Sequence, residues 1–194
     1  MGQRGGYSGV ITRAEEYLGI ALGANRDGNL NDVLDRLPVA IYLTDVHGTI
    51  THFNRACIEL AGRVPAVQHD KWCVTWKLYT LDGASLPHDQ CPMAVAIKER
   101  RPVRGAEAIA ERPDGTRIQF VPYPTPLFDE EGAFAGAVNL LVDVTQLRHA
   151  EYLRAQAARC RRLATSISDS RTIRTLTGMA EEYEGQAALL LAAN

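Results

Sequence analysis

Apolar and polar positions follow two different periods along the first third of the chain. Over residues 10–22 the apolar residues recur every three or four positions, which predicts a short amphipathic helix ended by Gly23. Residues 39–44 and 49–53 are instead short β-prone runs joined by the turn sequence Asp-Val-His-Gly. This second pattern predicts a β-hairpin.

Two asparagines mark the starts of predicted helices on either side of this hairpin. Asn31 precedes a brief helical stretch that Pro38 stops, and Asn54 precedes a helix that Gly62 closes. Asparagine is a favoured N-cap residue, and glycine is the usual residue just after a helix. The hairpin is therefore expected to lie between two short helices.

The middle of the chain returns to strands after one more helix. We expect residues 63–91 to be irregular and Pro92 to open a helix that runs to Arg101. Glycine-containing turn sequences then separate three β-prone runs, at residues 103–111, 117–127 and 134–144. The order of two strands, helices and three strands predicts an α+β fold with a five-stranded antiparallel sheet and helices on one face.

The C-terminal segment is helical in pattern. Apolar residues recur at steps of three and four over residues 145–167, the sequence Ser-Asp-Ser breaks the pattern, and a second such helix follows. The first helix is rich in arginine and the later part of the second carries glutamates. We expect a helical hairpin that packs on the sheet or pairs with a second chain. Binding of the arginines to an acidic partner or to nucleic acid is the less favoured alternative, because no recognition-helix pattern is present.

Composition adds limits to this picture. The expected organisation is a flexible N-terminus with its amphipathic helix over 1–28, a domain over 29–145 and the hairpin over 146–194. A net charge of −2 gives no overall attraction to nucleic acid or lipid, and the apolar runs are shorter than a membrane helix. The start of the chain lacks the pattern of a signal peptide, and the four cysteines form no C-x-x-C pair. We therefore expect a cytoplasmic protein without disulfides.

The stretch Leu-Pro-His-Asp-Gln-Cys-Pro-Met holds the main candidate chemistry. Cys91 directly precedes Pro92, so its sulfur is expected at a helix N-terminus, where the dipole lowers a thiol pKa. This position makes Cys91 a redox candidate. In the alternative interpretation the stretch is a loop ending in a cap, with Asp89 or Cys91 itself satisfying backbone amides. A further alternative is a metal site, with ligands His69, Cys73, His88 and Cys91.

Catalytic motifs are absent from the sequence. Ser8 lies in a Gly-flanked string but lacks a strand-to-helix elbow, and neither a phosphate-binding G-x-x-x-x-G-K-[ST] loop nor an H-E-x-x-H motif occurs. His149 lies among charged helix residues and is interpreted as solvated. We therefore expect a protein that is not an enzyme.

Several segments together resemble a PAS sensory domain. They are Leu37–Asp45, Ile50–Ala56, the Arg112–Thr116 turn and the closing Gly136–Thr145, and the resemblance covers about residues 30–145. It implies a five-stranded antiparallel sheet with flanking helices around a small pocket. It also implies that a ligand or cofactor binds there and that a signal leaves through the helix after Asp143-Val144-Thr145.

A concave apolar space under the short helices is where a ligand is expected. The predicted lining residues, which could equally be plain core, are Leu43, Phe53, Cys57, Met93, Ile97, Ile109, Phe120 and Leu140. The cofactor remains unknown: the flavin-binding Asn-Cys-Arg-Phe-Leu-Gln run is absent, and residues 93–101 lack the histidine of a haem sensor. Cys91 approximates the chromophore cysteine of the yellow photoreceptors, but the tyrosine and glutamate paired with it there are missing.

These observations predict a non-catalytic sensory or adaptor protein of signal transduction. It is expected to bind a small ligand, to form a homodimer through its helices and to relay a signal to a protein partner. The alternative is a redox sensor, or a haem- or metal-linked one, that uses Cys91 and His88.

Overall fold

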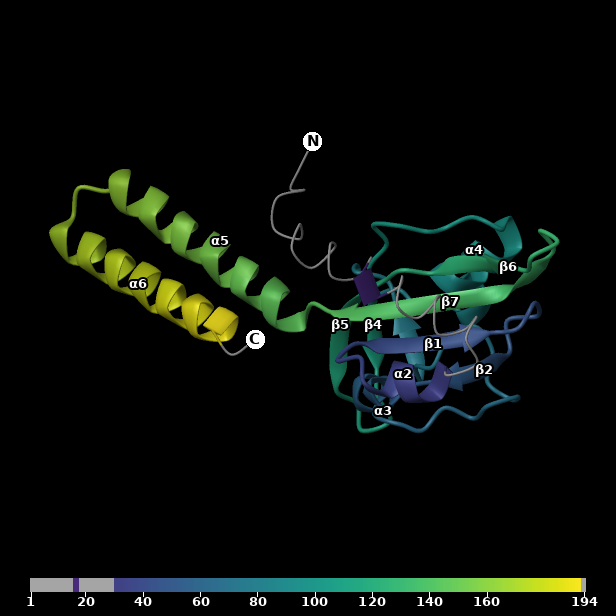
Figure 1. Ribbon diagram of the computed structural model, residues 1–194. Coiled ribbons are helices and arrows are strands. Elements are labelled where there is room, and N and C mark those ends of the chain that lie inside the picture. The colour runs from purple at the N-terminus through teal and green to yellow at the C-terminus, as the bar shows by residue number, and fades with distance from the viewer. Residues whose placement is uncertain (1–15, 18–29, 193–194) are drawn as a thin grey trace. The chain divides into compact units, whose positions relative to one another are not determined.

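The computed structural model describes residues 16–17 and 30–192, and Figure 1 draws the remainder as a thin trace. The chain divides into two compact units, the first ending at Asp143 and the second beginning at Val144. Residues 16 and 17 are helical. The other residues of the helix predicted over 10–22, like residues 1–9, lie outside the described part.

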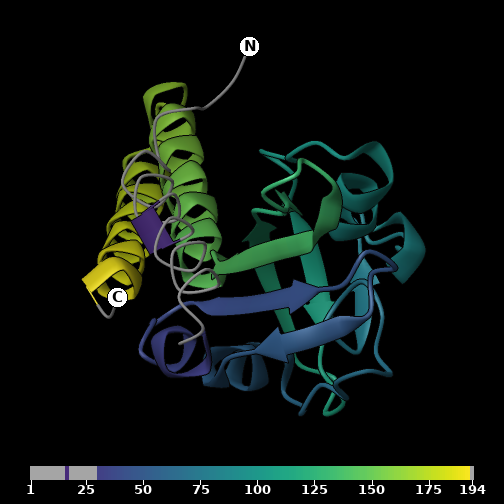
Figure 2. The same ribbon diagram turned by 45° about the vertical axis from the view of Figure 1, so that its right-hand side comes forward.

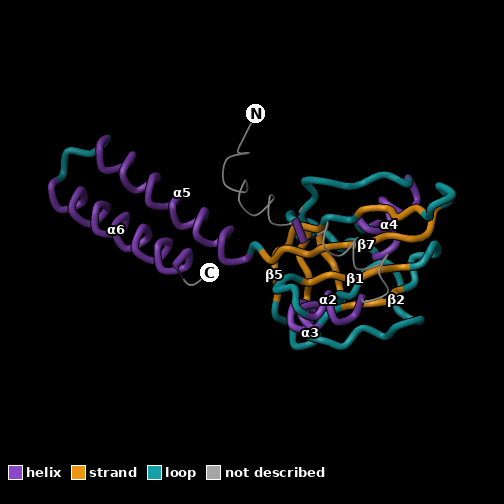
Figure 3. The backbone as a smooth tube through the Cα atoms, in the orientation of Figure 1, coloured by secondary structure: helices purple, strands orange, loops and turns teal. Residues whose placement is uncertain are grey.

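The first unit is an antiparallel sheet accompanied by short helices, as Figure 3 shows. Its helices are α2 (Leu30–Asp35), α3 (Arg55–Ala61), the single-turn 3₁₀ helix η1 (His88–Gln90) and α4 (Pro92–Glu99). Its strands are β1 (Ala40–Thr44), β2 (Ile50–Phe53), β3 (Lys77–Tyr79), β4 (Ala108–Glu111), β5 (Arg117–Pro122), β6 (Thr125–Phe128) and β7 (Phe134–Asp143). The strands lie in the order β2-β1-β7-β5-β4-β3, with β6 also paired to β7. The predicted α+β fold is confirmed.

The sheet contains two more strands than the five expected. One arises because the run 117–127 is interrupted between β5 and β6. Both pieces keep the same register against β7, with Phe120 opposite Asp143 and Pro126 opposite Ala137. The break falls at Pro124, which has no N–H to give to a ladder. The other extra strand, β3, is three residues long and lies inside the stretch expected to be irregular.

The core of this unit lies between one face of the sheet and the helices α3 and α4. Tyr42 of β1, Phe120 of β5 and Leu141 of β7 contribute from the sheet. Cys57 of α3 and Met93 of α4 meet them from the helices, and all five side chains are buried. The expectation that helices pack on one face of the sheet agrees with this cluster.

Asn54 holds the beginning of α3 to the preceding elements. Its side chain is fully buried and caps the helix by accepting from Cys57 N at 3.2 Å. The same oxygen accepts from Ile41 N at 3.0 Å, and the amide nitrogen donates to Leu34 O at 3.0 Å and Val39 O at 2.8 Å. One amide therefore joins α2, β1 and α3, and the predicted cap is confirmed.

The end of α3 is fixed by a glycine and an arginine. Gly62 adopts the left-handed conformation with φ 65° and donates its N–H to Ile58 O, as predicted for a helix stop. Arg112, in the loop before β5, donates to Leu60 O and Glu59 O, both at 3.0 Å. A Cβ at position 62 would lie 2.8 Å from the Arg112 side chain, so this contact also requires glycine.

The segment between α3 and α4 bonds to both edges of the sheet. At the β2 edge, Ile50 N donates to Asp70 O and Gln68 N donates to Ile50 O, each at 2.9 Å. At the β3 edge, Leu86 N donates to Leu78 O at 2.8 Å. These bonds occupy edge positions that would otherwise be open to pairing with another chain, and they fix the loop that carries the site described below.

The second unit is a hairpin of α5 (Thr145–Thr165) and α6 (Ser170–Ala192), seen in Figures 1 and 2. The two helices run antiparallel, because Leu153 packs near Ala187 while Cys160 packs near Ala180. Much of the buried interface is alanine, so the two helices can approach closely. Arg161 makes a bidentate pair with Glu184, at 2.9 and 2.7 Å. The predicted C-terminal helical hairpin is confirmed.

Replacement of Asn54 tests its role in joining these elements. We expect Asn54→Ala to lower the free energy of unfolding by about 3 kcal/mol, because it removes a helix cap and the side-chain hydrogen bonds to Ile41 N and Val39 O. Urea unfolding followed by tryptophan fluorescence measures the change. Asp114→Ala is the control, since Asp114 lies in an exposed turn and bonds only to Thr116. Equal losses in the two variants would contradict the role given to Asn54.

Candidate functional site

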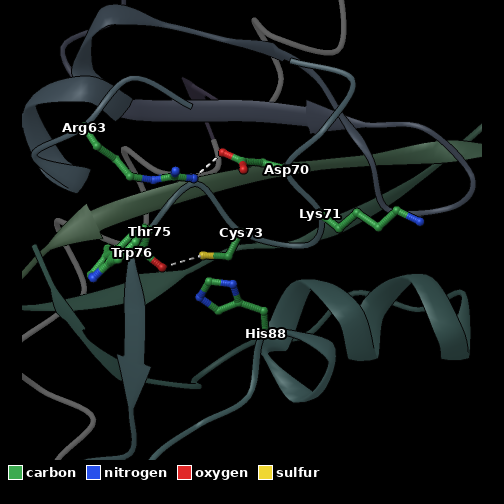
Figure 4. Close-up of a pocket in the computed structure, with 7 residues that line it drawn as sticks. All are labelled: Arg63, Asp70, Lys71, Cys73, Thr75, Trp76 and His88. Atoms are coloured by element: carbon green, nitrogen blue, oxygen red, sulfur yellow. Dashed lines mark hydrogen bonds and ion pairs between the residues drawn. The ribbon is translucent and has the colours of Figure 1, made fainter. Parts of the chain in front are cut away.

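A small polar pocket lies between the end of α3, the following loop and η1. Its volume is about 150 Å³. Figure 4 shows the side chains that line it, which are Arg63, Asp70, Lys71, Cys73, Thr75, Trp76 and His88.

An ion pair forms one wall of this pocket. The Arg63 guanidinium pairs with Asp70 and donates through Nε to Val74 O at 2.9 Å. The paired carboxylate oxygen of Asp70 also accepts from Ala66 N at 2.9 Å. Both charged side chains are about three-quarters buried. The pair therefore closes the loop after α3 and fixes a cation in the wall.

A histidine and a thiol form the opposite wall. In Figure 4 the His88 ring faces the Cys73 sulfur, which lies 3.1 Å from Thr75 Oγ1. Burial lowers the pKa of His88, and the nearby charge of Arg63 lowers it further, against an opposing contribution from Asp70. Burial raises the pKa of Cys73. Near pH 7 this wall therefore presents a largely neutral imidazole and a neutral thiol.

Two exposed side chains complete the lining. The indole of Trp76 is 51% exposed, although tryptophan is usually well covered. Lys71 is also exposed. The indole adds an apolar surface to the lining, whereas the Lys71 side chain points away from the other lining residues in Figure 4.

The predicted pocket residues divide between the two faces of the sheet. Cys57, Met93, Ile97 and Phe120 belong to the core cluster, and Phe53 packs against it. Leu43, Ile109 and Leu140 each neighbour a core residue in a strand, so they point to the opposite face. None of these eight residues is among those that line the polar pocket. Their role in ligand binding stays a prediction.

The sequence reasoning missed Arg63, Asp70 and Trp76 as site residues. They lie in a segment without helical or strand periodicity, and the backbone bonds between Asp70 and Ile50 bring the segment into place. Such long-range pairing leaves no local pattern. The Gly62 helix stop immediately before Arg63 is the one signal that marks where this loop begins.

Cys91 takes the predicted position but not the predicted acidity. It is the N-cap of α4, and its sulfur accepts from Ala94 N at 3.5 Å, as expected if the cysteine satisfies a backbone amide. The side chain is only 2% exposed, however, and burial raises its pKa to about 12. The expected lowering by the helix dipole was wrong, because loss of solvation disfavours the thiolate more strongly.

The alternative metal ligands do not form one site. Cys73 and His88 line the same pocket, but His69 is exposed outside it and the Cys91 sulfur lies 3.8 Å from Trp72 O. Across residues 16–17 and 30–192, no group of three or more His, Cys, Asp or Glu could hold a metal ion. Among the helices of this same part of the chain, none is long and apolar enough to cross a membrane.

The buried thiols are expected to make the free energy of unfolding decrease at alkaline pH. Burial raises the pKa of Cys57, Cys73 and Cys91, so each thiol ionises more readily in the unfolded chain than in the folded one. The contribution of these thiols to the free energy of unfolding is therefore fully present below their unfolded pKa of about 8.5 and is lost as the pH rises above it, for Cys91 until about pH 12. Each thiol is expected to contribute about 1.4 kcal/mol per pH unit in this window.

Urea unfolding between pH 8 and pH 10, followed by tryptophan fluorescence, measures this slope. Cys91→Ser is expected to reduce the slope by the share of one thiol. Cys160→Ser is the control and should leave it unchanged, because Cys160 lies in the second unit while both tryptophans lie in the first. Identical slopes for the Cys91→Ser variant and the parent protein would show that this thiol ionises equally in both states.

Comparison with solved structures returns PAS and LOV domains at low identity. The PAS domain of a protein from Colwellia psychrerythraea is 18% identical, covers 64% of this chain and 98% of its own, and has a TM-score of 0.41. The LOV protein of Rhodobacter sphaeroides is 12% identical, covers 87% and 96%, and has a TM-score of 0.45. The PAS domain of Bordetella pertussis BvgS is 18% identical, covers 67% and 93%, and has a TM-score of 0.42.

Comparison by sequence gives the family. No curated protein matches the chain. The family model described as PAS domain matches residues 38–146, which are more than half of the 194 residues. The match begins just before β1 and ends just after β7. The chain belongs to the PAS domain family.

Proposed function

We propose that this protein is a non-catalytic sensory or adaptor component of signal transduction. In this proposal residues 29–145 receive the signal and residues 146–194 pass it to a protein partner. Family membership supports the sensory role, since PAS domains are typically sensory. A cytoplasmic location is part of the same proposal.

The observation that carries this proposal is the course of β7. The strand pairs with β1, β5 and β6, so it joins both halves of the sheet. It ends at Asp143, and after the single residue Val144 the chain enters the 21-residue helix α5. A change in the sheet that moves the end of β7 is therefore transmitted to α5 through one residue. A ligand can drive such a change only if it binds two arrangements of the sheet with different affinity.

We also propose that the protein is a homodimer joined through the hairpin. Leu189 is 73% exposed on α6, and Gly178 and Gly185 share its side of the helix, opposite the buried Ala180 and Ala187. A Cβ added at either glycine would meet no atom within 4 Å. Each glycine costs about 1 kcal/mol in a helix interior, a loss that close packing of a second helix can offset.

The redox, haem-linked or metal-linked alternative has less support. It depends on Cys91 as a reactive thiol or on Cys91 and His88 as ligands. The raised pKa of Cys91 disfavours the thiolate that either role needs. His88 lies in the polar pocket, whereas Cys91 caps α4 in the core.

A charge placed on the proposed dimer face tests this arrangement. Multi-angle light scattering of the full chain should give twice the 21.3 kDa chain mass at micromolar concentration. We expect Leu189→Glu to weaken association by about tenfold or more, because each subunit then loses an apolar contact and gains a negative charge at the interface.

Leu81→Glu is the matched control, since Leu81 is 54% exposed in the first unit and should leave the dimer intact. A monomeric parent protein would overturn the proposed dimer. An effect of Leu81→Glu equal to that of Leu189→Glu would overturn the assignment of the interface.

A further inference from the structure

We infer that the pocket walled by Arg63, His88 and Trp76 binds a small organic monocarboxylate. The inference rests on the size of the pocket, the balance of charges in its lining and the apolar surface at its open side. It rests on the proposed function only for the consequence of binding, which is a signal in α5 and α6.

The volume limits the ligand to the size of one ring with a carboxylate. The pocket holds about 150 Å³. An apolar cavity of about 150 Å³ accommodates benzene, whereas pockets for drug-sized ligands are roughly 300–1,000 Å³. Nucleotides and other large cofactors therefore exceed this space.

The charges in the lining favour a ligand that carries a single negative charge. Arg63 and Asp70 form an ion pair and cancel, and the Lys71 side chain points away from the other lining residues in Figure 4. His88 is neutral before binding and takes up a proton beside a bound carboxylate, so the lining then carries one net positive charge. A monoanion balances this charge. A cation would meet the Arg63 guanidinium, and a dianion would leave one negative charge in excess.

Hydrogen-bond donors are available for the carboxylate. A guanidinium carries five N–H groups, and Val74 and Asp70 together accept through only two of the Arg63 nitrogens. Nη1 of Arg63 and the ring of His88 can therefore donate to a carboxylate between them. Both lie in the pocket wall, and the ion pair with Asp70 holds the guanidinium in place before any ligand arrives.

The exposed indole of Trp76 supplies the surface for the rest of the ligand. Half of this large apolar side chain faces solvent at the pocket, and covering it is favourable. A flat apolar body attached to the carboxylate can lie against the indole while the charged end points inward. This arrangement separates an aromatic monocarboxylate from inorganic anions of equal charge.

Binding is expected to take up a proton at His88. A carboxylate beside the ring stabilises the imidazolium and so raises the pKa of His88 in the complex, against the opposing charge of Arg63. Affinity should then fall as the pH rises through that pKa. Asp70, Lys71 and Cys73 are the other titratable groups of the lining.

Titration with benzoate tests the inference on the full chain. The indole N–H signals of the two tryptophans are followed by NMR, with Trp76→Leu used to assign them. Benzoate should shift the Trp76 signal saturably with a Kd of about 10 mM or tighter. Benzamide has the same shape without the charge, and it should bind at least about tenfold more weakly. Equal affinity for the two compounds, or no saturable shift with benzoate, would overturn the inference.

Variants locate the binding in the pocket. His88→Asn should weaken benzoate binding by about tenfold and remove the pH dependence between pH 5 and pH 7. His69→Asn is the matched control, because His69 is exposed in the same segment but outside the pocket. Equal losses in the His88 and His69 variants would overturn the assignment of the site. Arg63 is left intact, since it also closes the loop.

The same titration distinguishes failure of the proposed binding site from failure of the proposed sensory function. Light scattering and NMR are recorded on one sample. Saturable, His88-dependent binding of benzoate without any change in association supports the site and contradicts its use as a sensor. Absence of binding overturns the site, whereas the proposed homodimer stands or falls separately by light scattering of the parent protein and the Leu189→Glu variant.

Discussion

The buried amide of Asn54 is the interaction on which the arrangement of the first unit depends. It satisfies backbone groups of α2, β1 and α3 at once, in a position closed to water. Because β1 pairs with both β2 and β7, the cap fixes α3 against the centre of the sheet. The other end of α3 then delivers Arg63 to the pocket. The buried side chain of Asn54 thus helps to position the largely buried side chain of Arg63.

Desolvation is the largest influence on the pKa values of Cys91 and His88, the two candidate residues of the alternative redox or metal-linked function. At Cys91 the helix N-terminus and burial act in opposite directions, and burial dominates, so the thiol is a cap within the core. At His88 burial and the neighbouring guanidinium act together, so the imidazole is held neutral beside a fixed positive charge. The same physical effect therefore disfavours the thiolate that redox chemistry at Cys91 would need and places a neutral imidazole in the wall of the polar pocket.

Local signals predicted the elements, and long-range contacts determined the site. The Asn54 cap, the Gly62 stop and the Pro92 helix start each follow from the conformational preference of one residue, and all are present. The face of the sheet to which each strand residue points was harder to predict. Every residue of β1 is buried, so its sequence shows no alternation of apolar and polar residues. Leu43 and its neighbour Tyr42 therefore looked equivalent in sequence although they lie on opposite faces. The pocket could not be predicted from the sequence, because it depends on a backbone hydrogen bond between Ile50 and Asp70, which are twenty residues apart.

The proposed relay requires that an event in the first unit alter the helices of the second through β7. Hydrogen–deuterium exchange of the full chain, with benzoate as the probe and His88→Asn as the control, tests it most directly. Saturation of the pocket is expected to change the exchange rates of amides at the start of α5 in the parent protein and not in the variant. Unchanged exchange throughout α5 and α6 at saturating benzoate would contradict it.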